Sequence, residues 1–394
     1  MPKDNIDDFF KTSQNKKTRI LTLIVTKDCN LKCVYCYEKH NLRDKEFMDV
    51  SIAKDALIRY MNADDDYDLV QIEFFGGEPF LGFHFISEIV DWFHTQKWEK
   101  KHIFLIGTNG TILTDDMKKW LLENKSCLNI GLSLDGKKEA HDISRDKSYD
   151  KVLRNLPFFT ENWPHQPVKM TICAETIPYV ADSIIELEEM EINFTANIGF
   201  EDFWGDEENK NRLLEIYEEQ LSRLVDFYSK RTNLYPVKPI LGPIPDSLGL
   251  PKIEDNKEDK STIRFCGAGH EMVVIDTDGK NYPCHRFLPW VSGRRLGSAP
   301  VNCQTAWSPE KCKQCKLILS CPTCAGYNLE VNGDTGIRTT FHCEAYKTEV
   351  LSSAKLEAIR LRKRLSEVNK LPQQEKRKIR IRLEAILDLI ENGV

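Results

Sequence analysis

The first half of the chain alternates short apolar runs with segments of helical periodicity. Six runs rich in β-forming residues lie at positions 20–26, 71–75, 102–108, 128–134, 168–174 and 193–200. Helix-like segments lie between them, such as 85–94 and 115–124, the second with Thr114 as its expected N-cap. Near-continuous apolar strands separated by helices indicate a parallel sheet covered by helices. Six units are too few to close an eight-fold barrel, so we expect an α/β fold built on a partial (β/α)6 TIM-like barrel.

The second half of the chain has a different pattern. Residues 206–231 have the periodicity of one long amphipathic helix, and residues 232–262, rich in Pro, Gly and charge, are typical of a linker. A small cysteine-rich α+β domain is expected next, followed by C-terminal helices. The predicted organisation is a tail at 1–18, the barrel at 19–205, the helix and linker at 206–262, the cysteine-rich domain at 263–346 and the helices at 347–394.

The last predicted helix has one apolar face, which is formed by Ile379, Leu383, Ile386, Leu387 and Ile390. Such a face either docks on the helix's own protein or binds a partner. We favour docking, because packing of an amphipathic face is the ordinary source of helix stability in a globular protein.

Composition excludes some classes of protein. The 394 residues are 41% hydrophobic and 29% charged, which is ordinary for a globular protein. The net charge of −6 argues against a general nucleic-acid binder. The polar N-terminus lacks the apolar core of a signal peptide, and no apolar run is long enough to span a bilayer. We therefore expect a cytoplasmic protein with no nucleic-acid partner and no membrane partner.

The chain has 13 cysteines, and they are unevenly placed. Three directly follow the first predicted strand, at Cys29, Cys33 and Cys36. Seven more lie in the second half, at Cys266, Cys284, Cys312, Cys315, Cys321, Cys324 and Cys343. Cysteines of a reducing compartment rarely form disulfides, so this clustering favours metal ligation. The remaining three, Cys127, Cys173 and Cys303, are interpreted as simple thiols, although Cys303 is also a candidate ligand.

The triplet has the spacing CxxxCxxC and lies at the functional end of the expected barrel. A closed zinc site would want a fourth ligand, and His40 is the nearest candidate. A [4Fe–4S] cluster held by three cysteines instead leaves one iron free for a substrate or cofactor.

Polar groups follow three further predicted strands. The second strand ends in Gly76, Gly77 and Glu78, and the third ends in Thr108. The fourth ends in Ser133, and Arg145 follows in a loop. Glu78 could accept hydrogen bonds from an ammonium, and Arg145 could hold a carboxylate through two nitrogens. Ammonium, hydroxyl and carboxylate partners around an open iron fit an amino acid joined to a nucleoside.

These motifs resemble those of the radical S-adenosylmethionine (SAM) enzymes. The matching stretches are CNLKCVYC, GGEP, the serine of SLDG and the later arginine, within residues 19–205. The resemblance implies that SAM chelates the open iron, and that one-electron reduction by a donor such as flavodoxin or ferredoxin yields a 5′-deoxyadenosyl radical. The implied cofactor-binding residues are Tyr35 and Ile198 at the adenine, Gly76, Gly77 and Glu78 at the amino group, Thr108, Ser133 at the ribose, and Arg145 at the carboxylate.

The cysteine-rich region begins with a predicted hairpin, EMVVIDTDGKNYPC, in which DG is the turn signal. The compact stretch CKQCKLILSCPTC follows, and Cys343 comes later. Two structural zinc sites are one interpretation, although the two CxxC pairs are closer than in a usual zinc ribbon.

This region resembles the SPASM domain, an extension of peptide-modifying radical SAM enzymes that carries two auxiliary [4Fe–4S] clusters. The resemblance assigns Cys266, Cys284 and Cys324 to the first cluster, and Cys312, Cys315, Cys321 and Cys343 to the second. With the SAM-binding cluster, this predicts three [4Fe–4S] clusters. Only two residues separate Cys321 from Cys324, where the family usually has three. The seven cysteines leave one position of the first cluster open, unless Cys303 fills it.

Three functions compete. The first is a maturase that crosslinks a ribosomal peptide through a thioether or carbon–carbon bond. The second is an anaerobic sulfatase-maturating enzyme, whose relatives carry an aspartate after the cysteine that ends the hairpin. Here that position is His285, a possible catalytic group, and the difference favours the first function. The third is a non-catalytic iron–sulfur or zinc scaffold. Fewer than twenty residues precede the first predicted strand, so a leader peptide would need a separate leader-binding protein, the cysteine-rich domain or the C-terminal helices.

Overall fold

The computed structural model describes residues 17–38, 45–252, 266–292, 309–366 and 372–394. The interpretations of His40 and Cys303 concern residues outside these ranges. Within the described part of the chain, no helix is long and apolar enough to cross a membrane.

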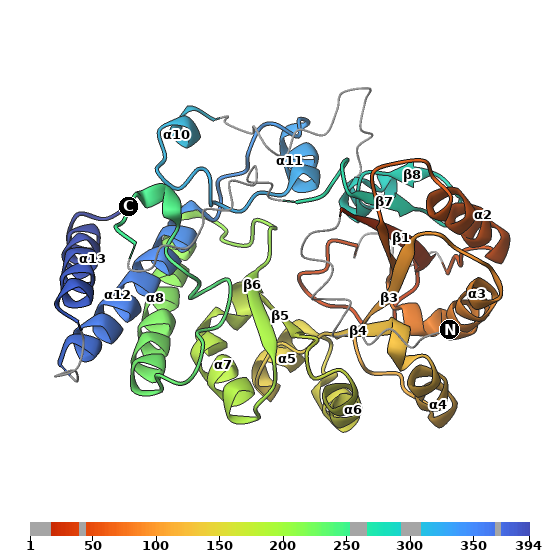
Figure 1. The fold of residues 1–394 in the computed structure, drawn as a ribbon, viewed down its shortest axis with the longest axis horizontal. Coiled ribbons are helices and arrows are strands. Elements are labelled where there is room, and N and C mark those ends of the chain that lie inside the picture. Colours follow the sequence, from red (N-terminus) through yellow and green to blue (C-terminus); the bar gives the residue numbers. More distant parts are fainter. Residues whose placement is uncertain (1–16, 39–44, 253–265, 293–308, 367–371) are drawn as a thin grey trace.

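Six parallel strands form the barrel, as the alternating pattern predicts (Figure 1). They are β1 (Thr18–Thr26), β2 (Leu69–Gly76), β3 (Lys101–Thr108), β4 (Leu128–Leu132), β5 (Val168–Ile172) and β6 (Phe194–Ile198). The first four pair in chain order, and β5 pairs with β6. A parallel bridge between Ser133 and Lys169 continues the order from β4 to β5. The fold is therefore a partial TIM-like barrel.

Helices cover the outer face of the sheet, because alternate residues of each strand are apolar and buried there. On β2, Val70, Ile72 and Phe74 join this core. The covering elements are α2 (Val50–Met61), η1 (Pro79–Gly82), α3 (Phe83–Thr95), α4 (Asp115–Glu123), η2 (Lys125–Cys127), α5 (Lys138–Ser144), α6 (Tyr149–Asn162), η3 (Ala174–Tyr179) and α7 (Val180–Glu189). The expected cap of α4 is present, since the Thr114 hydroxyl oxygen accepts from the Met117 amide at 3.2 Å.

The cysteine-rich region begins with the predicted hairpin, β7 (Met272–Ile275) and β8 (Asn281–Tyr282). It continues through η5 (His285–Phe287), α9 (Pro289–Ser292), α10 (Glu310–Lys313) and α11 (Ala325–Asn332). The hairpin is part of the barrel sheet, because β7 pairs in parallel with β1. A second hydrophobic core joins Ile24 of β1 to Val274, Phe287 and Leu329.

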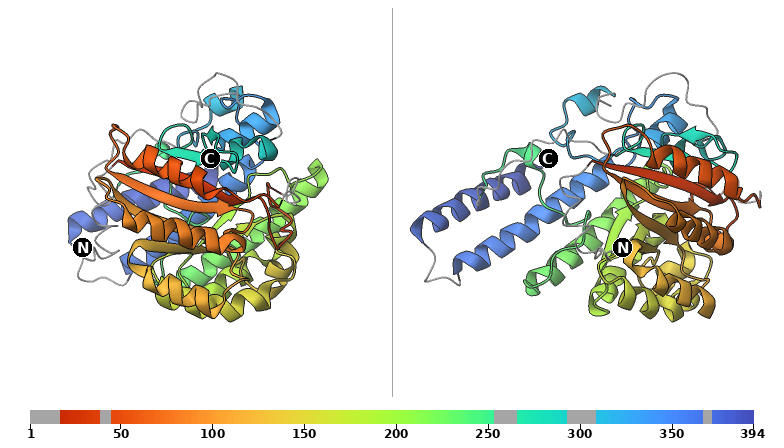
Figure 2. Two further views of the ribbon diagram at one scale, coloured as in Figure 1. Left: turned by 90° about the vertical axis from the view of Figure 1, so that its right-hand side faces the viewer. Right: turned by 45° about the vertical axis from the view of Figure 1, so that its right-hand side comes forward.

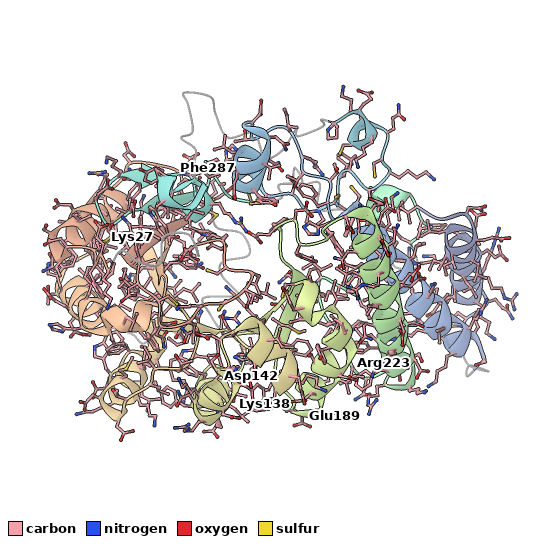
Figure 3. All side chains as sticks on the ribbon, turned by 180° about the vertical axis from the view of Figure 1, so that it is seen from behind. Lys27, Lys138, Asp142, Glu189, Arg223 and Phe287 are labelled. Carbon is pink, nitrogen blue, oxygen red and sulfur yellow. The ribbon has the colours of Figure 1, made fainter. Side chains whose placement is uncertain are left out.

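The second region lies over one end of the barrel. Figure 3 places Phe287 of that region and Lys27, just after β1, at the same end of the molecule. Lys27 forms an ion pair with Glu46 at 2.6 Å, and its ammonium lies 5.7 Å from the Trp290 ring centroid. The barrel and the cysteine-rich region therefore share a sheet, a hydrophobic core and a surface contact.

Two long helices, α12 (Cys343–Ser366) and α13 (Gln373–Asn392), complete the chain and follow a third, α8 (Glu207–Lys230), in the packing. α8 packs against α12, which packs in turn against α13. Figure 2 shows α12 and α13 side by side, extending away from the barrel. The apolar face of α13 docks on its own protein, with Ile379 and Ile386 fully buried.

The segment between α8 and the cysteine-rich region was expected to be a linker, but its described part is packed. Val237, Ile240 and Leu241 are almost completely buried. This segment also contains η4 (Asp246–Leu248). Proline and glycine signalled the absence of regular structure there, but the apolar residues between them still reach a core.

Candidate active site

The loop that carries the cysteine triplet is held against the end of β2. The Gly77 amide donates to the Thr26 carbonyl at 3.0 Å, and the Glu78 amide donates to the Asp28 carbonyl at 2.9 Å. A Cβ on Gly77 would lie 2.1 Å from the Asp28 carbonyl oxygen and 3.0 Å from the Cys29 Cβ. Only glycine permits this approach, so the GGE stretch fixes the backbone beside the first cysteine.

Glu78 joins the ends of β2 and β3. Its buried carboxylate accepts from the Thr108 hydroxyl and the Asn109 amide, both at 2.7 Å, and from the Phe80 amide at 3.0 Å. Burial raises the pKa of Glu78 to about 6 despite these bonds. The Asn109 side chain donates in turn to Asn30 at 2.9 Å, next to the first cysteine. The Thr108 hydroxyl is thus directed at Glu78.

Asp135 is the centre of a buried network beyond β4. One carboxylate oxygen accepts from the Tyr35 hydroxyl at 2.7 Å, the Ser144 hydroxyl at 2.8 Å and Arg145 Nε at 2.8 Å. The other accepts from the Thr171 amide at 2.9 Å. Burial opposes ionisation of this carboxyl, but the Arg145 charge and the Thr171 amide hold its pKa below the ordinary value. The network joins the cysteine loop to β4 and β5.

Arg145 donates to Asp135 through Nε alone, so its two terminal nitrogens bond to no described residue. The side chain is only 7% exposed, and its guanidinium lies 5.3 Å from the Tyr35 ring centroid. Its charge also reaches Cys33, where it offsets part of the rise in pKa that burial causes. A guanidinium held in this way can present a planar pair of donors toward the cysteine loop.

The three thiols of the triplet share one electrostatic environment. The pKa of Cys29 and of Cys36 is raised to about 12. Burial is the largest cause, and the neighbouring cysteines contribute. Thiolates in such a place need a strong positive partner, which a bound metal cluster supplies. Within the described residues, no three metal-ligating side chains converge tightly enough to hold a single ion. The assignment of Cys29, Cys33 and Cys36 to a four-iron cluster therefore rests on their spacing in the sequence.

Three other predicted cofactor residues lie at strand ends. Ser133 directly follows β4, half-buried, and its amide donates to the Thr108 carbonyl at 3.1 Å. Ile198 is the last residue of β6 and is also half-buried. Gly76 ends β2 with a φ of +136°, a conformation that favours glycine. The barrel topology thus places these residues along its carboxyl-terminal edge, to which the cysteine loop is also attached.

The cysteines of the second region fall into two groups. Burial raises the pKa of Cys284 and of Cys324; Cys324 and Cys266 also raise that of Cys284, and Cys266 also raises that of Cys324. Separately, Cys321 is influenced by Cys343, Cys315 and Cys312. The sequence analysis assigned the same two sets to two clusters, and that assignment stays a prediction. Among the described cysteines, none forms a disulfide.

His285 lies between two aromatic rings at the junction of the two regions. Its ring stacks on Phe75 at 4.9 Å and on Tyr37 at 5.5 Å between centroids. The pKa of His285 is lowered to about 4. Burial is the largest cause, and the charges of Arg286 and Lys169 contribute. The imidazole is therefore neutral at neutral pH, and one ring nitrogen can accept a proton.

A comparison with known families decides the class. Residues 23–177 match the family model of the Radical SAM superfamily, and this segment contains the cysteine triplet, Glu78, Asp135 and Arg145. The chain contains a radical SAM domain.

Curated relatives of this radical SAM enzyme modify other molecules. The cysteine-type anaerobic sulfatase-maturating enzyme of Clostridium perfringens is 24% identical over 350 residues, which cover 81% of this chain and 91% of that protein. The radical SAM cyclopropyl synthase TigE of Paramaledivibacter caminithermalis is 20% identical over 225 residues, which cover 52% of this chain and 47% of that one.

Solved structures share the fold of this radical SAM enzyme. Native anSMEcpe with AdoMet and the Kp18Cys peptide aligns with a TM-score of 0.63 at 21% identity, over 86% of this chain and 97% of that one. SuiB of Streptococcus suis bound to its precursor peptide SuiA aligns with a TM-score of 0.54 at 16% identity, over 85% and 78%.

Sequence reasoning missed the role of Asp135 in this radical SAM enzyme. The residue stood within the SLDG motif, but only its serine was assigned. A signal was available, because Asp135 follows a predicted buried strand, and a buried carboxylate needs hydrogen-bonding or charged partners. Of the two simple thiols that the structure describes, Cys173 is 2% exposed and Cys127 is half-buried.

Proposed function

We propose that this radical SAM enzyme is a peptide maturase that removes hydrogen from a side chain or α-carbon of a peptide substrate and installs a thioether or carbon–carbon crosslink. The observation that carries the proposal is the His285 position. It follows Cys284 and faces into the junction of the two regions between Tyr37 and Phe75. Peptide-bound relatives of the same fold support a peptide as the substrate.

The geometry of the described residues supports these cofactor roles. When bound, a [4Fe–4S] cluster with SAM supplies the 5′-deoxyadenosyl radical. We assign the cluster to Cys29, Cys33 and Cys36, the SAM carboxylate to the terminal nitrogens of Arg145, and the adenine to Tyr35 and Ile198. Gly76, Gly77 and Glu78 serve the amino group, and Ser133 serves a ribose hydroxyl. Thr108 acts through Glu78, to which its hydroxyl donates.

Forming a crosslink removes two hydrogens from the substrate. One leaves as a hydrogen atom, which the 5′-deoxyadenosyl group accepts. The other leaves as a proton together with one electron. We assign the proton to His285, because its ring lies at the junction of the two regions between Tyr37 and Phe75. The SPASM-type clusters, assigned to the seven cysteines from Cys266 to Cys343, would accept the electron.

The alternative is an anaerobic sulfatase-maturating enzyme, and a specific observation favours it. Relatives with that activity match this chain over nearly their whole length. The alternatives differ in product. A crosslinking maturase leaves its peptide lighter by two hydrogens and without an aldehyde, whereas a sulfatase-maturating enzyme converts a cysteine or serine to an aldehyde. Mass spectrometry after hydrazide trapping separates them, with a sulfatase-derived cysteine peptide and the peptide encoded beside this gene as substrates.

The first test measures iron and SAM cleavage. Anaerobically reconstituted protein should bind about twelve irons per chain, because three plus seven cysteines are assigned to three four-iron clusters. Replacing Cys29, Cys33 and Cys36 together by Ala should remove about four irons and abolish 5′-deoxyadenosine formation under dithionite. A triple variant that still forms 5′-deoxyadenosine, or a wild type with only about four irons, would contradict the assignment.

The remaining ligand and partners are also part of the proposal. Cys303 either closes the first auxiliary cluster or is a spare thiol, and the electron paramagnetic resonance spectrum of Cys303→Ala separates the two cases. We place the enzyme in the cytoplasm, with flavodoxin or ferredoxin as electron donor. If its substrate carries a leader, a separate leader-binding protein is the expected partner.

A further inference from the structure

Four strands present a row of residues to the interior of the barrel. On β3 and β4 the buried core takes Ile106 and Ile130, so Gly107 and Gly131 face the other side. These two glycines are paired in the sheet. The register that pairs Phe74 with Ile106 places Phe75 beside Gly107. The interior face therefore carries an aromatic ring followed by two positions without side chains.

The space above this glycine row is open. A Cβ on Gly107 would meet no atom within 4 Å. At Gly131 the nearest side-chain atoms belong to Lys169 of β5, whose Nζ would lie 3.9 Å from a Cβ there. With strands about 4.8 Å apart, Phe75 and Gly131 are separated by about 10 Å along the sheet. That width accommodates one polar side chain of a ligand.

Lys169 is the unpaired charge of this space. Its side chain is exposed, and it forms no hydrogen bond or ion pair with any described residue. The neighbouring carboxylates already have partners. Glu73 accepts from Thr22 at 3.0 Å, and Asp135 accepts from Arg145.

His285 closes the opposite side. Its ring stacks on Phe75, and the residue is half-buried. Phe75 lies beside Gly107, and Lys169 lies beside Gly131, so His285 and Lys169 lie toward opposite ends of the glycine row. An ammonium on one wall, an imidazole on the other and a bare floor between them form a site that adjoins Ser133, the residue assigned to the SAM ribose.

We propose that this space receives the carboxylate of an aspartate or glutamate side chain of the substrate peptide, with the Lys169 ammonium as its partner. The inference rests on the proposed function in one respect, because it takes the substrate to be a peptide that enters the barrel. A carboxylate is the group that an unpaired ammonium in a partly enclosed space binds most strongly. The bare glycines leave room for its methylene groups.

The test uses short capped peptides in matched pairs that differ only by Glu against Gln or Asp against Asn. Reconstituted, SAM-loaded protein is mixed with the pool, and retained peptides are quantified by mass spectrometry. The wild type should retain the acidic member of the pairs about twofold to fivefold better, as one contact to an exposed ammonium allows. Lys169→Met should abolish this preference, and Lys169→Glu should reverse it, so that the amide member of each pair is retained better.

Two further variants test the interpretation. Gly107→Val fills the open space without a clash at Cβ, and it should lower retention of acidic peptides. Lys138→Met removes a lysine from the outer helix α5, where Figure 3 shows it, and it should change nothing. Equal retention of acid and amide in the wild type, or a preference that survives Lys169→Met, overturns the proposal.

SAM cleavage separates this inference from the proposed function. All lysine variants should form 5′-deoxyadenosine under dithionite and bind SAM as the wild type does. If the wild type cleaves no SAM, the proposed function fails. If the wild type cleaves SAM but shows no charge preference, only the carboxylate site fails. If Lys169→Met loses SAM affinity, Lys169 belongs to the cofactor site and the inference is wrong.

Discussion

At the scale of single residues, one oxygen atom of Asp135 organises the candidate site. Three donors converge on it, and two of them, Tyr35 and Arg145, are assigned to SAM. The carboxylate is fully buried, so its charge is unscreened and the Arg145 charge beside it is balanced. Asp135 therefore positions the cofactor residues, although it is not itself assigned to the cofactor.

Asp135→Asn should damage both stability and SAM binding. The amide keeps one acceptor oxygen but loses the charge, and this leaves the Arg145 guanidinium buried without a counter-ion. Breaking a buried pair costs about 3–5 kcal/mol, so we expect a loss of that order in the free energy of unfolding in urea. SAM affinity, measured by equilibrium dialysis, should fall at least about tenfold.

The matched control for this change is Asp150→Asn. Asp150 is exposed and pairs with Lys138 at the surface, so its loss should cost less than about 1 kcal/mol and leave SAM affinity unchanged. Unchanged SAM affinity in Asp135→Asn would show that Tyr35 and Arg145 hold their positions without it.

At the scale of elements, the strand ends and the cysteine loop are joined by backbone contacts that tolerate no side chain. The clearest is the approach of Gly77 to Asp28 and Cys29. The loop itself has no regular secondary structure in its described residues. Its position therefore depends on these contacts with β2 and on the side-chain bonds to β3 and β4.

Gly77→Ala should displace the cysteine loop and lower cluster occupancy. The new methyl group would lie 2.1 Å from a backbone oxygen, and a backbone atom cannot move away as a side chain can. We expect reconstituted protein to lose about four irons and its SAM cleavage. Gly107→Ala is the control for iron content, because its methyl group meets no atom within 4 Å. Normal iron content in Gly77→Ala would contradict the assigned role of this contact.

The contact between α8 and α12 predicts a pH dependence. Glu349 of α12 accepts from the Tyr217 hydroxyl at 2.8 Å, and burial raises its pKa from 4.5 to about 7. The folded state holds this proton where the unfolded state has lost it. The contribution of Glu349 to stability is therefore complete below pH 4.5 and is lost as the pH rises through 7.

Glu349→Gln should remove this loss, since the amide still accepts from Tyr217 and does not ionise. Compared with the wild type in urea unfolding, the variant should gain of the order of 3 kcal/mol at pH 8 and little at pH 4.5. Glu218→Gln, on the exposed side of α8, is the control and should give parallel curves at both pH values. A constant difference between Glu349→Gln and the wild type would show that Glu349 does not titrate in this window.

The sequence predicted the elements well and some of their contacts poorly. All six barrel strands lie within two residues of their predicted bounds, because buried parallel strands are nearly continuous apolar runs. The gathering of Glu78, Ser133 and Arg145 followed from the topology alone. The role of Asp135 could not be predicted, because the donors that reach its oxygen come from different parts of the sequence and are brought together only by the fold. Nor did the pairing of β7 with β1, since Met272–Ile275 also suits an independent hairpin.

At the scale of the whole molecule, the barrel and the cysteine-rich region share a hydrophobic core. Ile24 of β1 is fully buried in the core formed with Val274 and Phe287. Its neighbour Leu23 is equally buried but faces the helices on the opposite side of the sheet. One strand therefore contributes alternate residues to two different cores.

Ile24→Ala and Leu23→Ala should have separable effects. Each deletes a fully buried side chain, at a cost of about 2–5 kcal/mol. Hydrogen exchange of backbone amides should locate the damage. Ile24→Ala should speed exchange in β7 and η5, whereas Leu23→Ala should speed it in α2. Identical exchange maps for the two variants would show that the two cores do not respond independently.

The pairing of β1 with β7 has a consequence for synthesis on the ribosome. β1 emerges early and finds β2 about 40 residues later, but its other edge has no partner until Met272–Ile275 is made, roughly 250 residues downstream. At about 5–20 residues per second, the nascent chain carries this open edge for roughly 12 to 50 s. An exposed strand edge is a template for pairing with other chains. Rapid overproduction should therefore yield insoluble protein, and slower translation should raise the soluble fraction.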